Sequence, residues 1–177
     1  MTAVHDEGRV GVVIRAARPD DLPGLQRIEA AADELLVERF DAEEWPPPAT
    51  PAERAALPGF ILVVEPADAA SSVVGFAHVL EVDGHAHLEQ LSVLPEYGRR
   101  GFGRMLVAAA KEEARRRGYQ SITLRTYLDV PWNAPFYATC GFRVSISSTA
   151  FLRSLLDVEA RLGLERYGRR VQMTAHL

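Results

Sequence analysis

Three glycines and three arginines lie within residues 98–104, directly after an apolar stretch that is typical of a strand. Glycines allow a backbone to approach a ligand closely, and the first N–H groups of a helix have no partner inside that helix. Arg99, Arg100 and Arg104 add positive charge at the same place. The segment therefore has the composition of an anion site suited to a pyrophosphate. The alternative is that the glycines only turn the chain and that solvent covers the arginines.

Other phosphate and nucleic-acid motifs fit this segment less well. A P-loop requires Gly-Lys followed by Ser or Thr, and neither Lys-Ser nor Lys-Thr occurs in the chain. A dinucleotide-binding turn has the reverse of the Gly-x-x-Gly-x-Gly spacing found here. Residues 100–103 match the start of an RNA-recognition signature, but Arg104 stands where that signature continues with an aromatic residue. The net charge of −4 also argues against binding to nucleic acid or to an anionic membrane.

Two histidines, one glutamate and one cysteine are the remaining candidates for chemistry. His85, His87 and Glu89 alternate along a predicted strand, and a period of two places them on one face together with Leu91. The two histidines fit a metal site, the lining or proton relay of an acceptor site, or the plain surface of a hairpin. No further ligand cluster accompanies them, so we expect no metal. Cys140, the only cysteine, is interpreted as a small buried residue rather than a nucleophile, because no histidine lies near it in the sequence.

Length and composition describe the protein that carries these residues. The 177 residues are 47% hydrophobic and 25% charged, which predicts one globular domain over residues 1–177. Residues 1–8 are expected to be a flexible N-terminus, and their acidic side chains do not fit a signal peptide. No apolar run approaches the length of a membrane span, and a single cysteine suits a reducing compartment. We therefore expect a cytoplasmic protein without membrane contact.

Hydrophobic periodicity and turn signals predict a mixed α/β domain. Strands are expected near residues 10–14, 60–65, 73–82, 85–93, 121–127, 142–147 and 170–176. Helices are expected over residues 19–38, 52–57, 102–118, 133–140 and 154–163. Asp83-Gly84 is a two-residue hairpin signal, and Asn133 fits the N-cap of a short helix. In this order the glycine-rich turn joins the end of a strand to the start of a helix.

Two motifs flank the predicted strand over residues 121–127. The first is Val93-x-Pro95-x-Tyr97-x-Arg99-Arg100-Gly101-Phe102-Gly103. The second is Asn133-Ala134-Pro135-Phe136-Tyr137 with Gly141-Phe142. Together they resemble the acyl-CoA pyrophosphate loop and the downstream signature of the GNAT superfamily of acyl-CoA-dependent N-acyltransferases, although Gly98 stands where that family usually has Gln or Arg. The resemblance implies the GNAT fold, a central, mostly antiparallel twisted sheet of about seven strands flanked by helices.

The resemblance also implies acetyl-CoA as co-substrate. Its pantetheine arm would bond main-chain groups near Leu91 and Val93. Its pyrophosphate would lie on the loop and helix start formed by Arg99, Arg100, Gly101, Phe102, Gly103 and Arg104. Asn133 is a cofactor contact, a plain N-cap, or both.

The reaction that the resemblance implies is direct attack of an amine on the thioester in a ternary complex. A primary amine of pKa about 10.4 is neutral in roughly one molecule in 2,500 at pH 7, so a general base is useful. Glu89 is the candidate base, directly or through water, and its alternative is a solvated or salt-bridged strand carboxylate. Tyr137 matches the family tyrosine that protonates the departing thiolate, and its alternative is a core tyrosine. The expected acceptor is a primary amine of a small molecule or peptide; a non-catalytic acyl-CoA or CoA sensor on the same fold is the alternative function.

Two weakly patterned segments are candidates for acceptor specificity. Residues 38–59 carry Asp41, Glu43, Glu44 and Trp45, which fit either a loop that attracts and covers a cationic amine or a solvated acidic loop. Residues 147–169 carry a helix with apolar side chains, which fits an acceptor wall, core packing or the interface of a homodimer.

Overall fold

Seven strands form one sheet within residues 11–69 and 72–177, which are the residues that the computed structural model describes. Their order across the sheet is β1-β2-β3-β4-β5-β7-β6, and every neighbouring pair is antiparallel except β4 and β5. The bounds are β1 Val12–Ala16, β2 Gly59–Pro66, β3 Gly75–Val82, β4 His85–Val93, β5 Ser121–Tyr127, β6 Arg143–Ser145 and β7 Arg170–His176. The predicted mixed α/β class with a mostly antiparallel sheet is confirmed, whereas the N-terminal segment over residues 1–8 lies outside the described residues.

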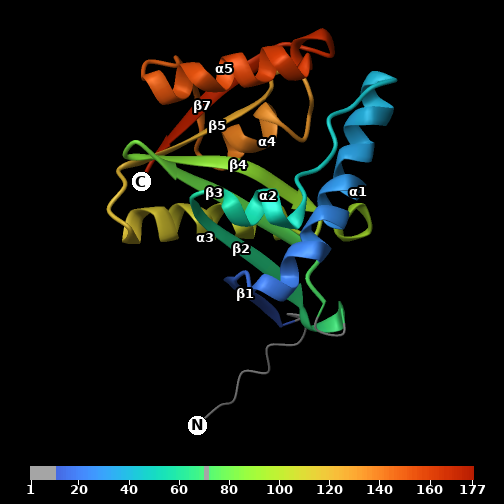
Figure 1. Cartoon of the computed structure of the whole chain (residues 1–177). Coiled ribbons are helices and arrows are strands. Elements are labelled where there is room, and N and C mark those ends of the chain that lie inside the picture. Colours follow the sequence, from blue (N-terminus) through green and yellow to red (C-terminus); the bar gives the residue numbers. More distant parts are fainter. Residues whose placement is uncertain (1–10, 70–71) are drawn as a thin grey trace.

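Helices cover both faces of this sheet (Figure 1). α3 packs on one face with α4 beside it, and α1, α2 and α5 lie on the other. The bounds are α1 Leu22–Phe40, α2 Pro51–Ala56, α3 Phe102–Arg116, α4 Ala134–Thr139 and α5 Ala150–Leu162, with 3-10 turns η1 Pro19–Asp21, η2 Ala67–Ala69, η3 Pro95–Tyr97 and η4 Leu164–Arg166. Within the described part of the chain, no helix is long and apolar enough to cross a membrane.

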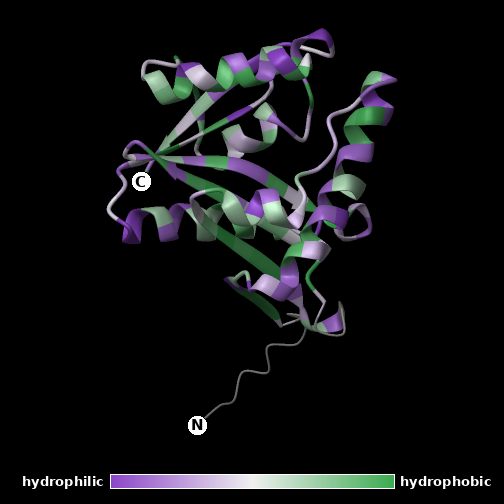
Figure 2. Cartoon of the chain, viewed as in Figure 1, coloured by the Kyte–Doolittle hydropathy of each residue, from purple (hydrophilic) through white to green (hydrophobic). Residues whose placement is uncertain are grey.

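The apolar stripe of α3 anchors the helix on the sheet. Its buried residues recur at helical spacing and are Phe102, Leu106, Val107, Ala110 and Ala114. They share one core cluster with strand residues such as Ile122 and Leu124. Figure 2 shows a mostly hydrophobic β2, a β4 that carries both hydrophobic and hydrophilic residues, and helices that also carry both kinds. Burial of one such side chain contributes about 1.5–3 kcal/mol, so the stripe holds the first turn of α3 in a defined place.

The largest differences from the predicted boundaries lie in the C-terminal third of the chain. α5 begins four residues before its predicted start at 154, because the Thr149 hydroxyl accepts a hydrogen bond from the Leu152 N–H (3.2 Å) and caps the helix. β6 is shorter than predicted at both ends. The Phe142 N–H donates to the Tyr137 carbonyl of α4 (3.1 Å), and the pairing with β7 ends at Ser145. Asn133 stands at the N-cap position of α4, but its side chain makes no capping bond.

A β-bulge in β4 sets the direction of the side chains that follow it. In the pairing with β3, Leu88 and Gln90 have partners, and Glu89 between them has none. The extra residue reverses the alternation of faces, so Leu91 packs toward α3. The prediction that Leu91 shares a face with His87 and Glu89 is therefore wrong.

β4 and β5 separate after a short parallel contact. Their register begins at Ala86 with Ile122 and ends at Leu88 with Leu124, although both strands continue. Beyond this point the main-chain groups along that side of β4 have no β5 partner. The two diverging strands therefore open the middle of the sheet directly before the glycine-rich turn.

Candidate active site

The opening between β4 and β5 belongs to a cavity of about 1250 Å³. The start of α3, the residues before α4 and α4 itself border it on one side, and α1, the proline-rich segment after α1 and α5 border it elsewhere. The predicted site residues that line it are Glu89, Leu91, Val93, Arg99, Gly101, Phe102, Gly103, Arg104, Asn133 and Tyr137. One cavity thus brings together residues from both sequence motifs and from the strand before them.

Glu89 lies on the cavity wall at the bulge. Its side chain is 43% exposed because it opens onto the cavity, while the surrounding protein shields the carboxylate from bulk water. Burial raises the pKa of Glu89 above its ordinary value. The positive charges of Arg170 and Arg54 oppose this rise, and the negative charge of Glu159 adds to it. A raised pKa makes a carboxylate that faces a cavity a stronger base than an ordinary glutamate carboxylate.

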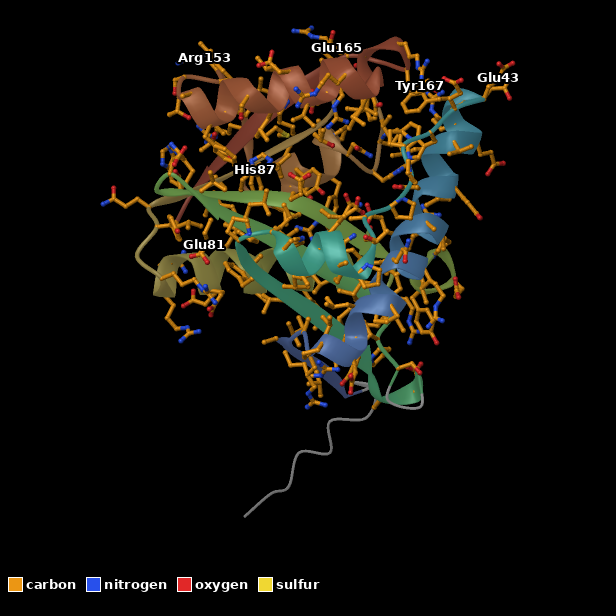
Figure 3. All side chains as sticks on the ribbon, viewed as in Figure 1. Glu43, Glu81, His87, Arg153, Glu165 and Tyr167 are labelled. Atoms are coloured by element: carbon orange, nitrogen blue, oxygen red, sulfur yellow. The ribbon has the colours of Figure 1, made fainter. Side chains whose placement is uncertain are left out.

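The two histidines of β4 occupy different environments. His87 lines the cavity, is 2% exposed, and has its Nδ1 2.8 Å from the Thr123 hydroxyl oxygen. Burial lowers the pKa of His87 to about 4, so the ring is neutral and its Nε2, 3.7 Å from the Glu89 carboxylate, forms no ion pair at neutral pH. His85 instead stacks on Phe151 of α5. Figure 3 shows His87 in the interior, between β4 and α5.

Of the three interpretations of this pair, lining of the acceptor site fits the position of His87. Among residues 11–69 and 72–177, no three His, Cys, Asp or Glu side chains are grouped so that they could hold a metal ion. Cys140 is half-buried and does not line the cavity.

The glycine-rich turn ends at Gly101, which precedes α3 with a φ of 85°. Glycine adopts this left-handed conformation without the strain that a side chain would cause. The Met105 N–H donates to the Gly101 carbonyl (3.0 Å) and makes the first bond of the helix, so the helix does not use the N–H groups of residues 102–104. These three residues all line the cavity, and the positive end of the helix dipole favours an anion there.

Gly98 is required by a close approach within the turn. A Cβ atom at this position would lie 2.9 Å from the Pro95 carbonyl oxygen, which accepts a hydrogen bond from the Gly98 N–H (3.0 Å). The turn therefore has no room for the Gln or Arg that is usual in the motif it resembles. Arg99, the next residue, lines the cavity from a left-handed conformation with a φ of 61°.

The three arginines of the turn occupy different positions. Arg99 and Arg104 line the cavity, and the Arg104 guanidinium donates a hydrogen bond to the Thr139 carbonyl of α4 (2.9 Å). Arg100 does not line it, because its guanidinium pairs with Asp68 at 2.8 Å. Contact between Arg100 and a cofactor stays a prediction, and Arg99 and Arg104 are better placed for it.

Residues of the second motif bring Tyr137 and Asn133 to the cavity. The Tyr137 ring packs against Phe136 and Phe142, with centroid distances of 5.1 and 5.8 Å. Burial raises the pKa of the Tyr137 hydroxyl above its ordinary value, so the phenol is protonated at neutral pH. The Asn133 Oδ1 accepts a hydrogen bond from the Thr126 hydroxyl of β5 (2.6 Å), which ties this motif to the diverging strand.

A charged wall on α1 was missed by the sequence analysis. Glu29 forms an ion pair with Arg54 of α2, which is 2% exposed, and Asp33 accepts a hydrogen bond from the Trp45 side chain. Burial raises the pKa of Asp33 to about 6 and also raises that of Glu29, against the opposing charge of Arg54. The signal available in the sequence was a pair of acidic residues four positions apart beside the apolar stripe of this helix.

Only part of the acidic, proline-rich segment reaches the cavity. Trp45 lines it, whereas Asp41, Glu43 and Glu44 do not. Figure 3 shows Glu43 at the outer end of α1, and Glu44 pairs with Arg166 at the surface (3.4 Å). The contribution of this segment to the cavity is therefore mainly aromatic and apolar.

α5 supplies another wall of the cavity. Its lining residues follow one helical stripe and are Leu155, Val158, Glu159 and Leu162. Glu159 is buried and pairs with Arg125 of β5 (2.9 Å) and with Arg170 of β7 (2.8 Å). The ion pairs fix α5 to the two strands beneath it.

Comparison with protein families matches residues 28–142 to a model of the acetyltransferase (GNAT) family. The matched segment runs from α1 through both sequence motifs and therefore contains most of the cavity wall.

Solved structures with the same fold include the PaiA N-acetyltransferase from Thermoplasma acidophilum in complex with coenzyme A, with 18% identity and a TM-score of 0.67 over 94% of this chain and 99% of that chain. The ribosomal-protein-S18-alanine N-acetyltransferase from Escherichia coli has 19% identity and a TM-score of 0.65 over 94% of each chain. The N-acetylglutamate synthase from Neisseria gonorrhoeae, in complex with coenzyme A and N-acetyl-glutamate, has 15% identity and a TM-score of 0.66 over 96% of this chain and 36% of that chain. At these identities the likeness shows a common fold, and the named acceptors differ.

Proposed function

Because this chain belongs to the GNAT acetyltransferase family, we propose that it transfers an acetyl group from acetyl-CoA to a primary amine of a small molecule or peptide. The observation that carries the proposal is the content of one cavity. It joins a helix start suited to a pyrophosphate, a carboxylate of raised pKa and a protonated phenol. These groups can bind a nucleotide thioester, accept a proton from an amine and assist the departure of the thiolate.

The residues of the cavity fit a thioester substrate that carries a pyrophosphate. The N–H groups of residues 102–104 and the dipole of α3 favour negative phosphates, and Arg99 and Arg104 add positive charge. The unpaired side of β4 near Leu91 and Val93 offers main-chain donors and acceptors to an extended, amide-bearing arm. Coenzyme A is present in two of the compared structures, which supports acetyl-CoA as the co-substrate.

Glu89 is the proposed general base. It accepts a proton from the acceptor ammonium, directly or through water, and the neutral amine then attacks the thioester carbonyl. Burial raises the pKa of Glu89 toward the working pH, which improves its match to this task. His87 is neutral beside it and therefore adds no positive charge that would oppose this rise.

Tyr137 is the proposed acid. As the new C–N bond forms and the C–S bond breaks, its phenol donates a proton to the departing thiolate. The second proton leaves the amine nitrogen after attack and returns to the Tyr137 phenolate through water, while the proton on Glu89 is released to solvent. An ordinary phenol has a pKa about 1.5 units above that of a thiol, and burial of Tyr137 widens this gap. The proton transfer is therefore uphill, and Tyr137 assists by hydrogen bonding and position more than by acidity.

Direct attack in a ternary complex is the proposed route. Cys140 does not line the cavity, which argues against a covalent acyl-cysteine. The amines named for the compared structures include the alanine of a ribosomal protein, and one complex contains an N-acetylated amino acid. Both kinds of acceptor are compatible with the proposal.

The experiment that tests the proposal combines binding and turnover. Acetyl-CoA and CoA are expected to raise the melting temperature, and acetyl-CoA with a panel of amines is expected to release free thiol. A sensor of acyl-CoA would show the stabilisation without thiol release. Absence of both effects would exclude the enzyme and the sensor alike.

A further inference from the structure

Two arginines share one carboxylate on the α5 side of the cavity. Arg125 of β5 and Arg170 of β7 both pair with Glu159, at 2.9 and 2.8 Å. The three side chains are only 7%, 13% and 8% exposed, and all three residues line the cavity. Hydrogen bonds from both arginines hold the pKa of Glu159 below its ordinary value although burial alone would raise it, so the group carries a formal charge of +1.

Glu159 balances only one of the two guanidinium charges. Within residues 11–69 and 72–177, Glu159 is the only carboxylate that forms an ion pair with either guanidinium. His87 is neutral, and Glu89 feels the charge of Arg170 without an ion pair to it. Within the described part of the chain the Nε–H of Arg170 is buried without a hydrogen-bond acceptor, whereas Arg125 has a second acceptor in the Ser147 hydroxyl oxygen (3.5 Å). A buried excess charge is costly unless a ligand compensates it.

Arg170 is held in a fixed orientation. Its guanidinium lies over the Tyr127 ring, 4.6 Å from the centroid, and Glu159 binds one of its terminal nitrogens. Tyr127 is itself 2% exposed and donates a hydrogen bond to the Leu164 carbonyl (2.9 Å). A guanidinium that is stacked and paired in this way is preorganised to bind a carboxylate.

The other walls offer complementary features for the rest of an acceptor. Asp33 and Glu89 present carboxylates that form no ion pair with an Arg or Lys side chain within the described part of the chain, and they suit an ammonium group. Leu155, Val158 and Leu162 form an apolar stripe on α5. One cavity therefore provides carboxylates for the ammonium group of an acceptor, guanidinium groups for its carboxylate, and the apolar stripe of α5 for its side chain.

We propose that Arg170, supported by Arg125, binds a carboxylate of the acceptor, so that the preferred acceptors are apolar amino acids rather than peptide amines or simple alkylamines. This inference rests on the proposed acetyl transfer and names its substrate class. The guanidinium pair recognises the carboxylate, Glu89 receives the proton of the neighbouring ammonium, and α5 contacts the side chain.

The test compares leucine with leucinamide and isoamylamine as acceptors, with acetyl-CoA saturating, by thiol release and mass spectrometry of the product. Loss of one partner of a buried charge pair costs a factor of about 10² or more. We therefore expect kcat/KM for leucine to exceed that for isoamylamine by about that factor. Arg170→Gln should abolish the preference for leucine while leaving KM for acetyl-CoA unchanged. Arg170→Lys should retain part of the preference for leucine. Because this variant keeps the positive charge next to Glu159, it also serves as a control for a folding defect.

Arg153→Gln is the matched control, because Arg153 is exposed on the outer side of α5 (Figure 3) and does not line the cavity. It should keep the wild-type preference. The carboxylate site is refuted, while acetyl transfer stands, in either of two cases. In the first, kcat/KM of the wild type is as high for leucinamide and isoamylamine as for leucine. In the second, Arg170→Gln lowers kcat/KM for all three acceptors by the same factor. If other amines of the panel are acetylated but none of these three is, the inference likewise fails and acetyl transfer stands. If a protein that binds CoA acetylates no amine of the panel, the proposed function itself fails.

Discussion

Replacement of Glu159, which joins α5 to the sheet, by glutamine should lower the melting temperature of the protein. The glutamine side chain has the same shape but leaves Arg125 and Arg170 as two buried cations without a counter-charge. Removing one partner of a buried ion pair typically costs about 3–5 kcal/mol. In a chain of this size each kcal/mol lowers the melting temperature by about 2–4 °C, so Glu159→Gln is expected to lower it by about 6–20 °C.

The assay is thermal and urea unfolding of Glu159→Gln beside Glu165→Gln. Glu165 is exposed on the outer side of the molecule (Figure 3), and its substitution should change the free energy of unfolding by less than about 0.5 kcal/mol. The two variants thus distinguish the effect of removing a buried, paired carboxylate from the effect of removing one negative charge at the surface.

The same substitution has a pH signature. Burial would raise the pKa of Glu159, but the hydrogen bonds from Arg125 and Arg170 outweigh it and lower the pKa in the folded state. Such a group contributes stability above its unfolded pKa, and that contribution is lost as the pH falls through the folded value. The difference in unfolding free energy between wild type and Glu159→Gln should therefore shrink below about pH 4.5. A difference under about 1 kcal/mol at pH 7, or one that acid does not reduce, would refute the buried ion group.

Three further predictions concern the reaction and the cofactor. Tyr137→Phe should lower kcat by about 10- to 100-fold with KM for acetyl-CoA unchanged, and an unaltered kcat in single-turnover measurements would remove Tyr137 as the acid. Glu89→Gln should cost most at low pH, because the neutral fraction of an amine of pKa about 10.4 rises roughly 100-fold from pH 7 to pH 9; a loss that is constant with pH would exclude Glu89 as the base. Arg99→Gln should weaken CoA binding more than Arg100→Gln in calorimetric titrations at low salt, with the difference fading at high salt, and equal effects would contradict the distinct positions of these arginines.

Local patterns in the sequence predicted most of the fold. The Asp83-Gly84 turn marks the hairpin of β3 and β4, and the 3.6-residue periodicity after Gly101 marks α3. Both signals are contained within a few neighbouring residues. Residues of both motifs meet in one cavity, with Arg100 as an exception, because a strand, a glycine-rich turn and a helix leave little choice of geometry; their roles stay predictions.

Features that depend on contacts between distant segments were not predictable in this way. The bulge at Glu89 is a property of the register with β3, and a period of two along β4 alone placed Leu91 on the wrong face. Glu29 and Arg54, which are 25 residues apart in the chain, join helices α1 and α2. Arg170, which lies in the last strand, gains its place in the cavity only because β7 inserts between β5 and β6.

Transfer of isotope-labelled acetyl from acetyl-CoA, followed on acceptor and protein together, tests the central claim most directly. The protein, labelled acetyl-CoA and an amine panel that includes leucine would be analysed by mass spectrometry of both small molecules and intact protein. We expect the label on the amine nitrogen in amounts equal to the thiol released, with none on Cys140. Label that stays on CoA with every amine, while the protein still binds acetyl-CoA, would contradict the proposed enzyme.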